Sequence, residues 1–208
     1  MFKRKTNLDR RTRKGETSYY AEIATWLKDY VNATLKEFGN YLVDAEVCHP
    51  GALSEGIARL MIKNKIKSAE LQRKIALTKE LKVDIILLIY DVTSERSEIV
   101  ICEVKKKDGL SLMDCSQLLG YCISADFNFG LLINVDGGLT DTFRDILTQN
   151  TILTHVVQIV NGEKKTRKMA FLMWESKTRR GIFLPNGYLK NLREFSREIS
   201  DCLKQNES

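Results

Sequence analysis

Residues 83–107, VDIILLIYDVTSERSEIVICEVKKK, decide the fold. The runs at 83–91 and 98–104 are short, apolar and rich in Ile and Val, which is typical of buried β-strands. A polar segment, TSERS at 93–97, separates the two runs. The sequence therefore predicts a β-hairpin.

The predicted hairpin brings two carboxylates together at its open end. If the turn is centred between Thr93 and Ser94, Asp84 lies directly opposite Glu103, and cross-strand β-carbons are about 5 Å apart. Glu103 and Lys105 are two residues apart on one strand, so their side chains share a face. Asp84, Glu103 and Lys105 are therefore expected to meet.

These residue types suit metal-dependent phosphodiester hydrolysis. Mg²⁺ prefers oxygen ligands, so Asp84, Glu103 and the main-chain carbonyl of Val104 are the expected metal ligands. A metal-bound water has a lowered pKa and can attack phosphorus. Lys105 is expected to orient or deprotonate that water and to offset charge on the phosphate.

The remaining pattern predicts a mixed α/β domain with a central β-sheet flanked by helices. Helices are expected at 16–38, 53–79, 111–124, 139–149 and 188–204, and further strands at 41–47, 130–135, 152–160 and 168–175. Neither a repeat nor a low-complexity linker interrupts this order. We therefore expect a single domain over 15–208, preceded by an arm at 1–14.

Charge indicates an anionic partner. The net charge is +6, and the arm MFKRKTNLDRRTRK holds seven Lys or Arg and one acid. Further basic clusters are Lys106 and Lys107; Lys164, Lys165, Arg167 and Lys168; and Lys177, Arg179 and Arg180. They are expected to form a groove for a DNA backbone, although such clusters are often simply solvated.

Several other classes are excluded by missing motifs. A P-loop, a G-x-S-x-G nucleophile motif and a Cys-x-x-Cys zinc pair are all absent. No apolar run is long enough to span a membrane, and no secretion signal opens the sequence. Five irregularly spaced cysteines favour an intracellular, reducing compartment, so a cytoplasmic location is expected.

Context separates one Glu-x-Lys motif from three others. The pattern occurs at Glu80, Glu103, Glu163 and Glu175. The motif at Glu80 precedes a strand, and the motif at Glu163 is expected in a polar turn. The motif at Glu175 follows a strand, but no acid begins the strand before it. Only the motif at Glu103 has the preceding acid, the hairpin and a following helix.

This arrangement resembles the PD-(D/E)XK nuclease superfamily over roughly residues 16–135. That family has an α-β-β-β-α-β core, an Asp that starts one strand and a Glu-x-Lys on the next; Val83 stands here where the family name has proline. The resemblance implies a restriction-endonuclease-like core and a Mg²⁺- or Mn²⁺-dependent DNA endonuclease. The archaeal Holliday-junction-resolvase-like and RecB-like branches are similar, and the former implies a homodimer. The lysine-rich, proline-poor composition fits an archaeal or archaeal-virus source, such as a Sulfolobus spindle-shaped virus.

The resemblance adds further site residues. Gln117 and Tyr121 match a Gln, often followed by a Tyr, in the helix after the motif; otherwise they are a surface Gln and a half-buried Tyr. The family also supplies an acid from its first helix. Glu16 and Glu22 compete for this role, and we favour Glu16 because apolar or aromatic residues follow it at +3, +4 and +7.

Two alternatives stay open at this point. The same fold could serve as a non-catalytic DNA-binding or assembly module. An RNA-directed nuclease would share the site and differ only in its substrate.

Overall fold

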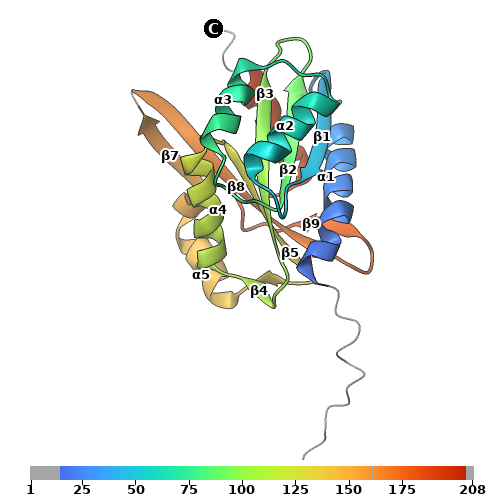
Figure 1. Cartoon of the computed structure of the whole chain (residues 1–208). Coiled ribbons are helices and arrows are strands. Elements are labelled where there is room, and N and C mark those ends of the chain that lie inside the picture. The colour runs from blue at the N-terminus through green and yellow to red at the C-terminus, as the bar shows by residue number, and fades with distance from the viewer. Residues whose placement is uncertain (1–14, 161, 205–208) are drawn as a thin grey trace, which may run out of the picture.

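The computed structural model describes residues 15–160 and 162–204 and confirms a mixed α/β fold. Its centre is a seven-stranded mixed sheet in the order β1-β2-β3-β5-β8-β7, with β9 paired to β8 (Figure 1). The strands are β1 (Tyr41–Val47), β2 (Ile85–Asp91), β3 (Ser97–Lys105), β5 (Phe129–Val135), β7 (His155–Val160), β8 (Glu163–Glu175) and β9 (Arg180–Phe183). A separate pair joins β4 (Gly109–Leu110) to β6 (Gly138–Leu139).

Helices cover both faces of this sheet, as Figure 1 shows. They are α1 (Tyr20–Leu35), α2 (Leu53–Lys63), α3 (Ala69–Leu77), α4 (Leu112–Ser124), α5 (Asp141–Gln149) and α6 (Leu192–Lys204), with short 3-10 helices η2 (Glu16–Tyr19) and η3 (Thr151–Leu153). Helices α1 and α6 pack on one face, and α2 to α5 pack on the other.

Burial on two sides explains the unbroken apolar run of β2. Ile85, Leu87 and Ile89 point into the core under α1 and α6, whereas Ile86 and Leu88 point into the opposite core. A strand in this position has no solvent side, so polar alternation is absent.

The predicted hairpin is confirmed. Strands β2 and β3 are antiparallel, and Ile85 pairs with Cys102. The same register, extended by one residue, sets Asp84 opposite Glu103. Asp84 directly precedes β2, and its Oδ2 accepts a hydrogen bond from the Val104 amide at 2.8 Å. The carboxylate is thereby fixed to the end of β3.

The prediction of one helix over 53–79 is wrong. The segment forms α2 and α3, and the break lies at Lys65, whose φ of 55° is left-handed and cannot continue a helix. A new helix then begins because the Ser68 side chain accepts from the Leu71 amide and caps its first turn.

Other boundaries also differ. The predicted turn NGEKK covers residues 161–165, but 163–165 belong to β8, which begins at Glu163 rather than at 168; strand β9 is not among the predicted strands. The first helix ends at Leu35 rather than 38, and residues 151–153 form η3 ahead of β7. The helices predicted from 139 and 188 begin at Asp141 and Leu192.

Three further expectations concern the N-terminal arm, membrane-spanning helices and the cysteines. The arm at 1–14 lies outside the described residues. Across the described residues, none of the helices has the length and apolar character needed to cross a bilayer. All five cysteines are unpaired thiols.

Candidate active site

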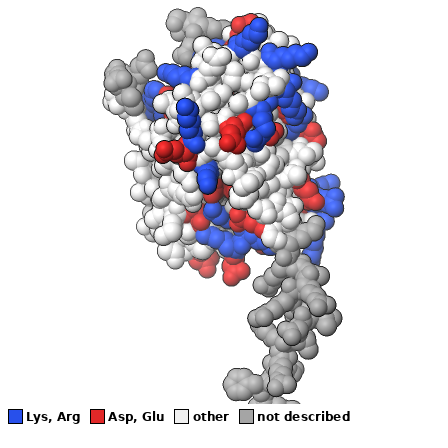
Figure 2. All heavy atoms as spheres, viewed as in Figure 1, with Lys and Arg blue, Asp and Glu red and all other residues white. Residues whose placement is uncertain are grey.

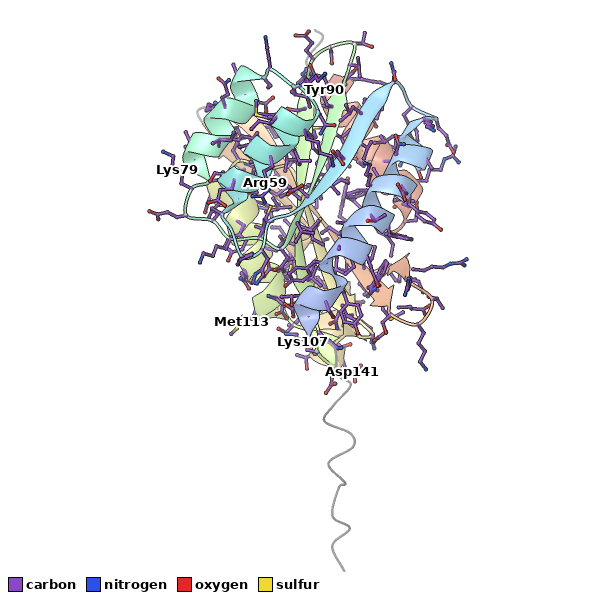
Figure 3. All side chains as sticks on the ribbon, turned by 45° about the vertical axis from the view of Figure 1, so that its right-hand side comes forward. Arg59, Lys79, Tyr90, Lys107, Met113 and Asp141 are labelled. Carbon is purple, nitrogen blue, oxygen red and sulfur yellow. The ribbon has the colours of Figure 1, made fainter. Side chains whose placement is uncertain are left out.

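The candidate site lies at the end of the sheet where β3 finishes and β2 starts. Figure 3 labels Lys107, just beyond β3, at this end beside the start of α1, and Tyr90 at the opposite end. Helix η2 borders the site, because the Lys106 amide donates to Glu16 Oε2 at 2.9 Å. Residues from three distant parts of the sequence therefore meet here.

Glu103 is the central carboxylate. It is only 5% exposed, and Asp84 is 8% exposed. Lys105 donates from Nζ to Glu103 Oε1 at 2.6 Å. Glu103 Oε2 is buried and has no hydrogen-bond partner among the described residues. A buried, unpartnered carboxylate oxygen is costly unless a ligand compensates it.

The surroundings of Glu103 disfavour its ionised form. Burial raises the pKa of Glu103, the nearby acids Asp84 and Glu16 raise it further, and Lys105 only partly opposes this. Burial alone would lower the pKa of Lys105, but Glu103, Asp84 and Glu16 together raise it. Lys105 is therefore an ammonium cation in this arrangement, which suits contact with a phosphate better than a base role.

Tyr20 connects the first-helix acid to the site, although the sequence pattern predicts only a core-facing helix position for it. Its hydroxyl donates to Glu16 Oε1 at 3.0 Å, and the residue is 3% exposed. Burial raises the pKa of Tyr20, and so do Asp84 and Glu16. The i, i+4 spacing of Glu16 and Tyr20 is the signal that could have found this pair.

The other competing acid lies elsewhere. Glu22 faces Arg179, whose Nη2 lies 4.0 Å from Glu22 Oε1. Glu16 thus reaches the end of β3, whereas Glu22 points toward the turn between β8 and β9.

Gln117 and Tyr121 are not brought to the carboxylates. Gln117 is exposed on α4, and its Nε2 donates to the Tyr121 hydroxyl at 2.9 Å. The described part of the structure gives neither residue a bond to Asp84 or Glu103. The two do share a helix face, as their spacing predicted.

The predicted magnesium ligands fit a cation in part. Asp84 and Glu103 supply hard oxygen donors, and the unpartnered Glu103 Oε2 is the atom that a cation would satisfy. However, no group of three or more His, Cys, Asp or Glu side chains arranged to hold a metal occurs among residues 15–160 and 162–204. Waters or substrate oxygens would have to complete the shell around Mg²⁺, which commonly keeps several waters.

The basic clusters separate into two groups. Lys106 and Lys107 follow β3, and Lys177, Arg179 and Arg180 follow β8, at the same end of these parallel strands. The cluster at 164–168 lies at the opposite end and is largely ion-paired: Lys165 and Arg167 with Asp126, and Lys168 with Glu198. The fold therefore does not form one continuous basic groove through all three clusters.

The visible surface carries both signs of charge. Figure 2 shows blue and red side chains interleaved on this face, with a mixed band toward its lower end. Just beyond β3, Lys107 Nζ donates to Asp114. Basic residues here act beside acids rather than as a uniform positive field.

No family model, curated protein or solved structure matches the chain in comparisons with known proteins. The class of site therefore follows from its own residues: a buried acidic cluster with one ammonium group at the end of a β-hairpin.

Proposed function

We propose that the protein is a divalent-metal-dependent DNA endonuclease of the PD-(D/E)XK type. The observation that carries the proposal is the convergence of Glu16, Asp84, Glu103 and Lys105, with Glu103 Oε2 buried and unpartnered. The pKa of Glu103 is raised by its burial and by the neighbouring acids Asp84 and Glu16, and a carboxylate in such surroundings favours a bound cation.

Each residue has a role in this proposal. Asp84, Glu103 and the Val104 carbonyl would hold Mg²⁺ or Mn²⁺, which when bound supplies an activated water and neutralises phosphate charge. Lys105, held by Glu103, keeps its ammonium beside the acids and can pair with the scissile phosphate. Glu16 fixes η2 to the end of β3 through the Lys106 amide.

The proposal extends to substrate and assembly. The basic residues after β3 and β8 suit contact with a DNA backbone without base-specific readout. Branched DNA such as a Holliday junction is the expected substrate by resemblance, and a homodimer would provide two active sites for two strands. Gln117 stays a candidate only through that resemblance.

The test measures cutting of labelled linear duplex and four-way junction DNA with Mg²⁺, Mn²⁺ or EDTA. Glu103→Gln is the active-site variant. Glu98→Gln is the matched control, because Glu98 lies on the same strand at the other end of the sheet, where it accepts from Asn128 at 2.7 Å. We expect metal-dependent cutting by the native protein and the control, and none by Glu103→Gln.

The rival is a non-catalytic DNA-binding module. It predicts tight binding without cutting, unchanged in Glu103→Gln. Equal cutting by native protein and Glu103→Gln would point to a contaminating nuclease and would also reject the proposal.

A further inference from the structure

An aromatic pocket lies between α1 and the turn that joins β8 to β9. Its volume is about 450 Å³. It is lined by Ala21, Glu22, Thr25, Trp26, Asp29, Tyr30, Trp174 and Arg179. Trp26 and Tyr30, one helical turn apart on α1, stack with ring centroids 4.8 Å apart and an interplanar angle of 26°.

The fold holds this aromatic pair at the surface. Trp174 meets Trp26 edge-on at 6.0 Å, and a Cβ at Gly181 would lie only 2.6 Å from Trp26 Cη2. Glycine on β9 therefore leaves room for the indole. Tyr30 remains 45% exposed. Trp26 packs partly against the core, so the Tyr30 ring is the part of the pair that stays open to solvent.

A basic path leads from the candidate site to the pocket. Asp136, after β5, accepts from the Ser176 amide at 2.8 Å and from its hydroxyl at 2.6 Å, which ties β5 to the turn after β8. Burial raises the pKa of Asp136, but Ser176, Lys106 and Lys177 outweigh it. Lys106 and Lys177 thus lie near the same carboxylate, and Arg179, two residues on, lines the pocket.

We propose that this pocket binds a nucleobase of single-stranded DNA. Bases stack on aromatic side chains while lysines and arginines follow the backbone, and both elements are present here. Glu22 and Asp29 supply carboxylate acceptors for an exocyclic amino group such as that of cytosine. Arg179, 4.0 Å from Glu22, has a side chain 72% exposed and is available to a phosphate.

The inference rests on the proposed function and deepens it. Trp26 lies ten positions after Glu16 along η2 and α1, a span of roughly 15–20 Å, or on the order of a few nucleotides. The substrate class is therefore narrowed from branched DNA in general to branched DNA that carries an unpaired strand next to the cleaved bond. Fully paired linear duplex offers no free base to stack.

The chain carries a built-in probe for this site. It has two tryptophans, Trp26 and Trp174, and both line the pocket. Intrinsic fluorescence is followed while an oligodeoxycytidylate is added in EDTA, so that no cutting occurs. An abasic oligonucleotide of equal length keeps the phosphates and lacks the bases. We expect quenching by the first and much weaker quenching by the second.

Two variants test whether the oligonucleotide binds at this pocket. Tyr30→Leu keeps an apolar side chain and removes the stacking ring, and it should weaken binding of the oligodeoxycytidylate roughly 5- to 150-fold. Tyr90→Leu is the matched control at the opposite end of the sheet (Figure 3) and should bind normally. Circular dichroism verifies that both variants are folded.

Three outcomes would overturn the inference: equal quenching by the abasic strand, unchanged affinity in Tyr30→Leu, or quenching by spermidine but not by DNA, which would identify a cation site. Quenching without any metal-dependent cutting would support the base site and reject the nuclease. Metal-dependent cutting without quenching would support the nuclease and reject the base site.

Discussion

Asp44 on β1 offers a perturbation whose size can be worked from the structure. Its side chain is 3% exposed and receives Lys63 at 2.7 Å from α2 and Lys28 at 3.1 Å from α1. Asn64 donates to it at 3.0 Å. One carboxylate thus connects the edge strand to helices on both faces of the sheet. Asp44→Asn removes its charge and keeps its shape.

The magnitude follows from the pKa. Burial raises the pKa of Asp44, but the bonds from Lys63, Asn64 and Lys28 outweigh it and lower the pKa from 3.8 to about 2. A shift of about two units corresponds to roughly 2–3 kcal/mol. Because Lys28 and Lys63 are 42% and 54% exposed, water and salt screen part of this, so we expect Asp44→Asn to cost about 1–2 kcal/mol at pH 7.

The sign of the pH dependence is also fixed. A lowered carboxyl pKa stabilises the fold above pH 3.8, and this stability is lost as the pH falls toward 2. Urea unfolding at pH 7 and at pH 3 measures the difference between native protein and Asp44→Asn. The difference should shrink at pH 3, and the exposed Asp201→Asn should cost little at either pH. An equal cost at both values would refute the electrostatic reasoning.

Three further predictions concern the candidate site. Tyr20→Phe should lower the cutting rate, because it removes the hydroxyl that donates to Glu16 and so loosens η2 at the end of β3; an unchanged rate would remove Tyr20 from the site. Mg²⁺ at ten times its Kd should stabilise the native protein by about 1.4 kcal/mol, measured by thermal unfolding, and should leave Glu103→Gln unchanged. Equal shifts would mean that the cation binds elsewhere. Gln117→Ala should alter stability by no more than about 0.5 kcal/mol and leave cutting intact, since its bond is to Tyr121 on an exposed surface. A large loss of cutting would favour the family role over the observed geometry.

The central hairpin was predictable because its signals are local. Two apolar runs and a polar turn fix β2 and β3, and the turn centre fixes the register that sets Asp84 opposite Glu103. Neighbours along the chain carry all of this information, so one sequence is enough.

The start of β8 was not predictable for the opposite reason. Its residues 164–168 are mostly basic and resemble a turn. Arg167 is nevertheless 1% exposed, because Asp126, 41 residues earlier, accepts from its guanidinium at 2.7 Å. A strand whose charges are neutralised by a distant acid has no local pattern that distinguishes it from a loop.

The first-helix acid was only partly predictable from the sequence. Sequence favoured Glu16 over Glu22, but the distinction depends on where the helix begins. Residues 16–19 form a 3-10 turn rather than the first turn of α1, and the Lys106 amide that Glu16 accepts from is 90 residues away. Only the packing of α1 on the sheet determines which acid reaches β3.

Glu103 shows why a site can conflict with local stability. The apolar run around it predicts a core position, and an apolar side chain there would avoid both the raised pKa and the unpartnered oxygen. The neighbouring acids Asp84 and Glu16 make the conflict worse rather than relieving it. Places where a sequence breaks its own packing rules are those where function is expected. The strongest support for a bound cation is therefore the unpartnered Oε2 of Glu103, and the Mg²⁺-dependent stability of the native protein against Glu103→Gln measures directly how far a cation compensates it.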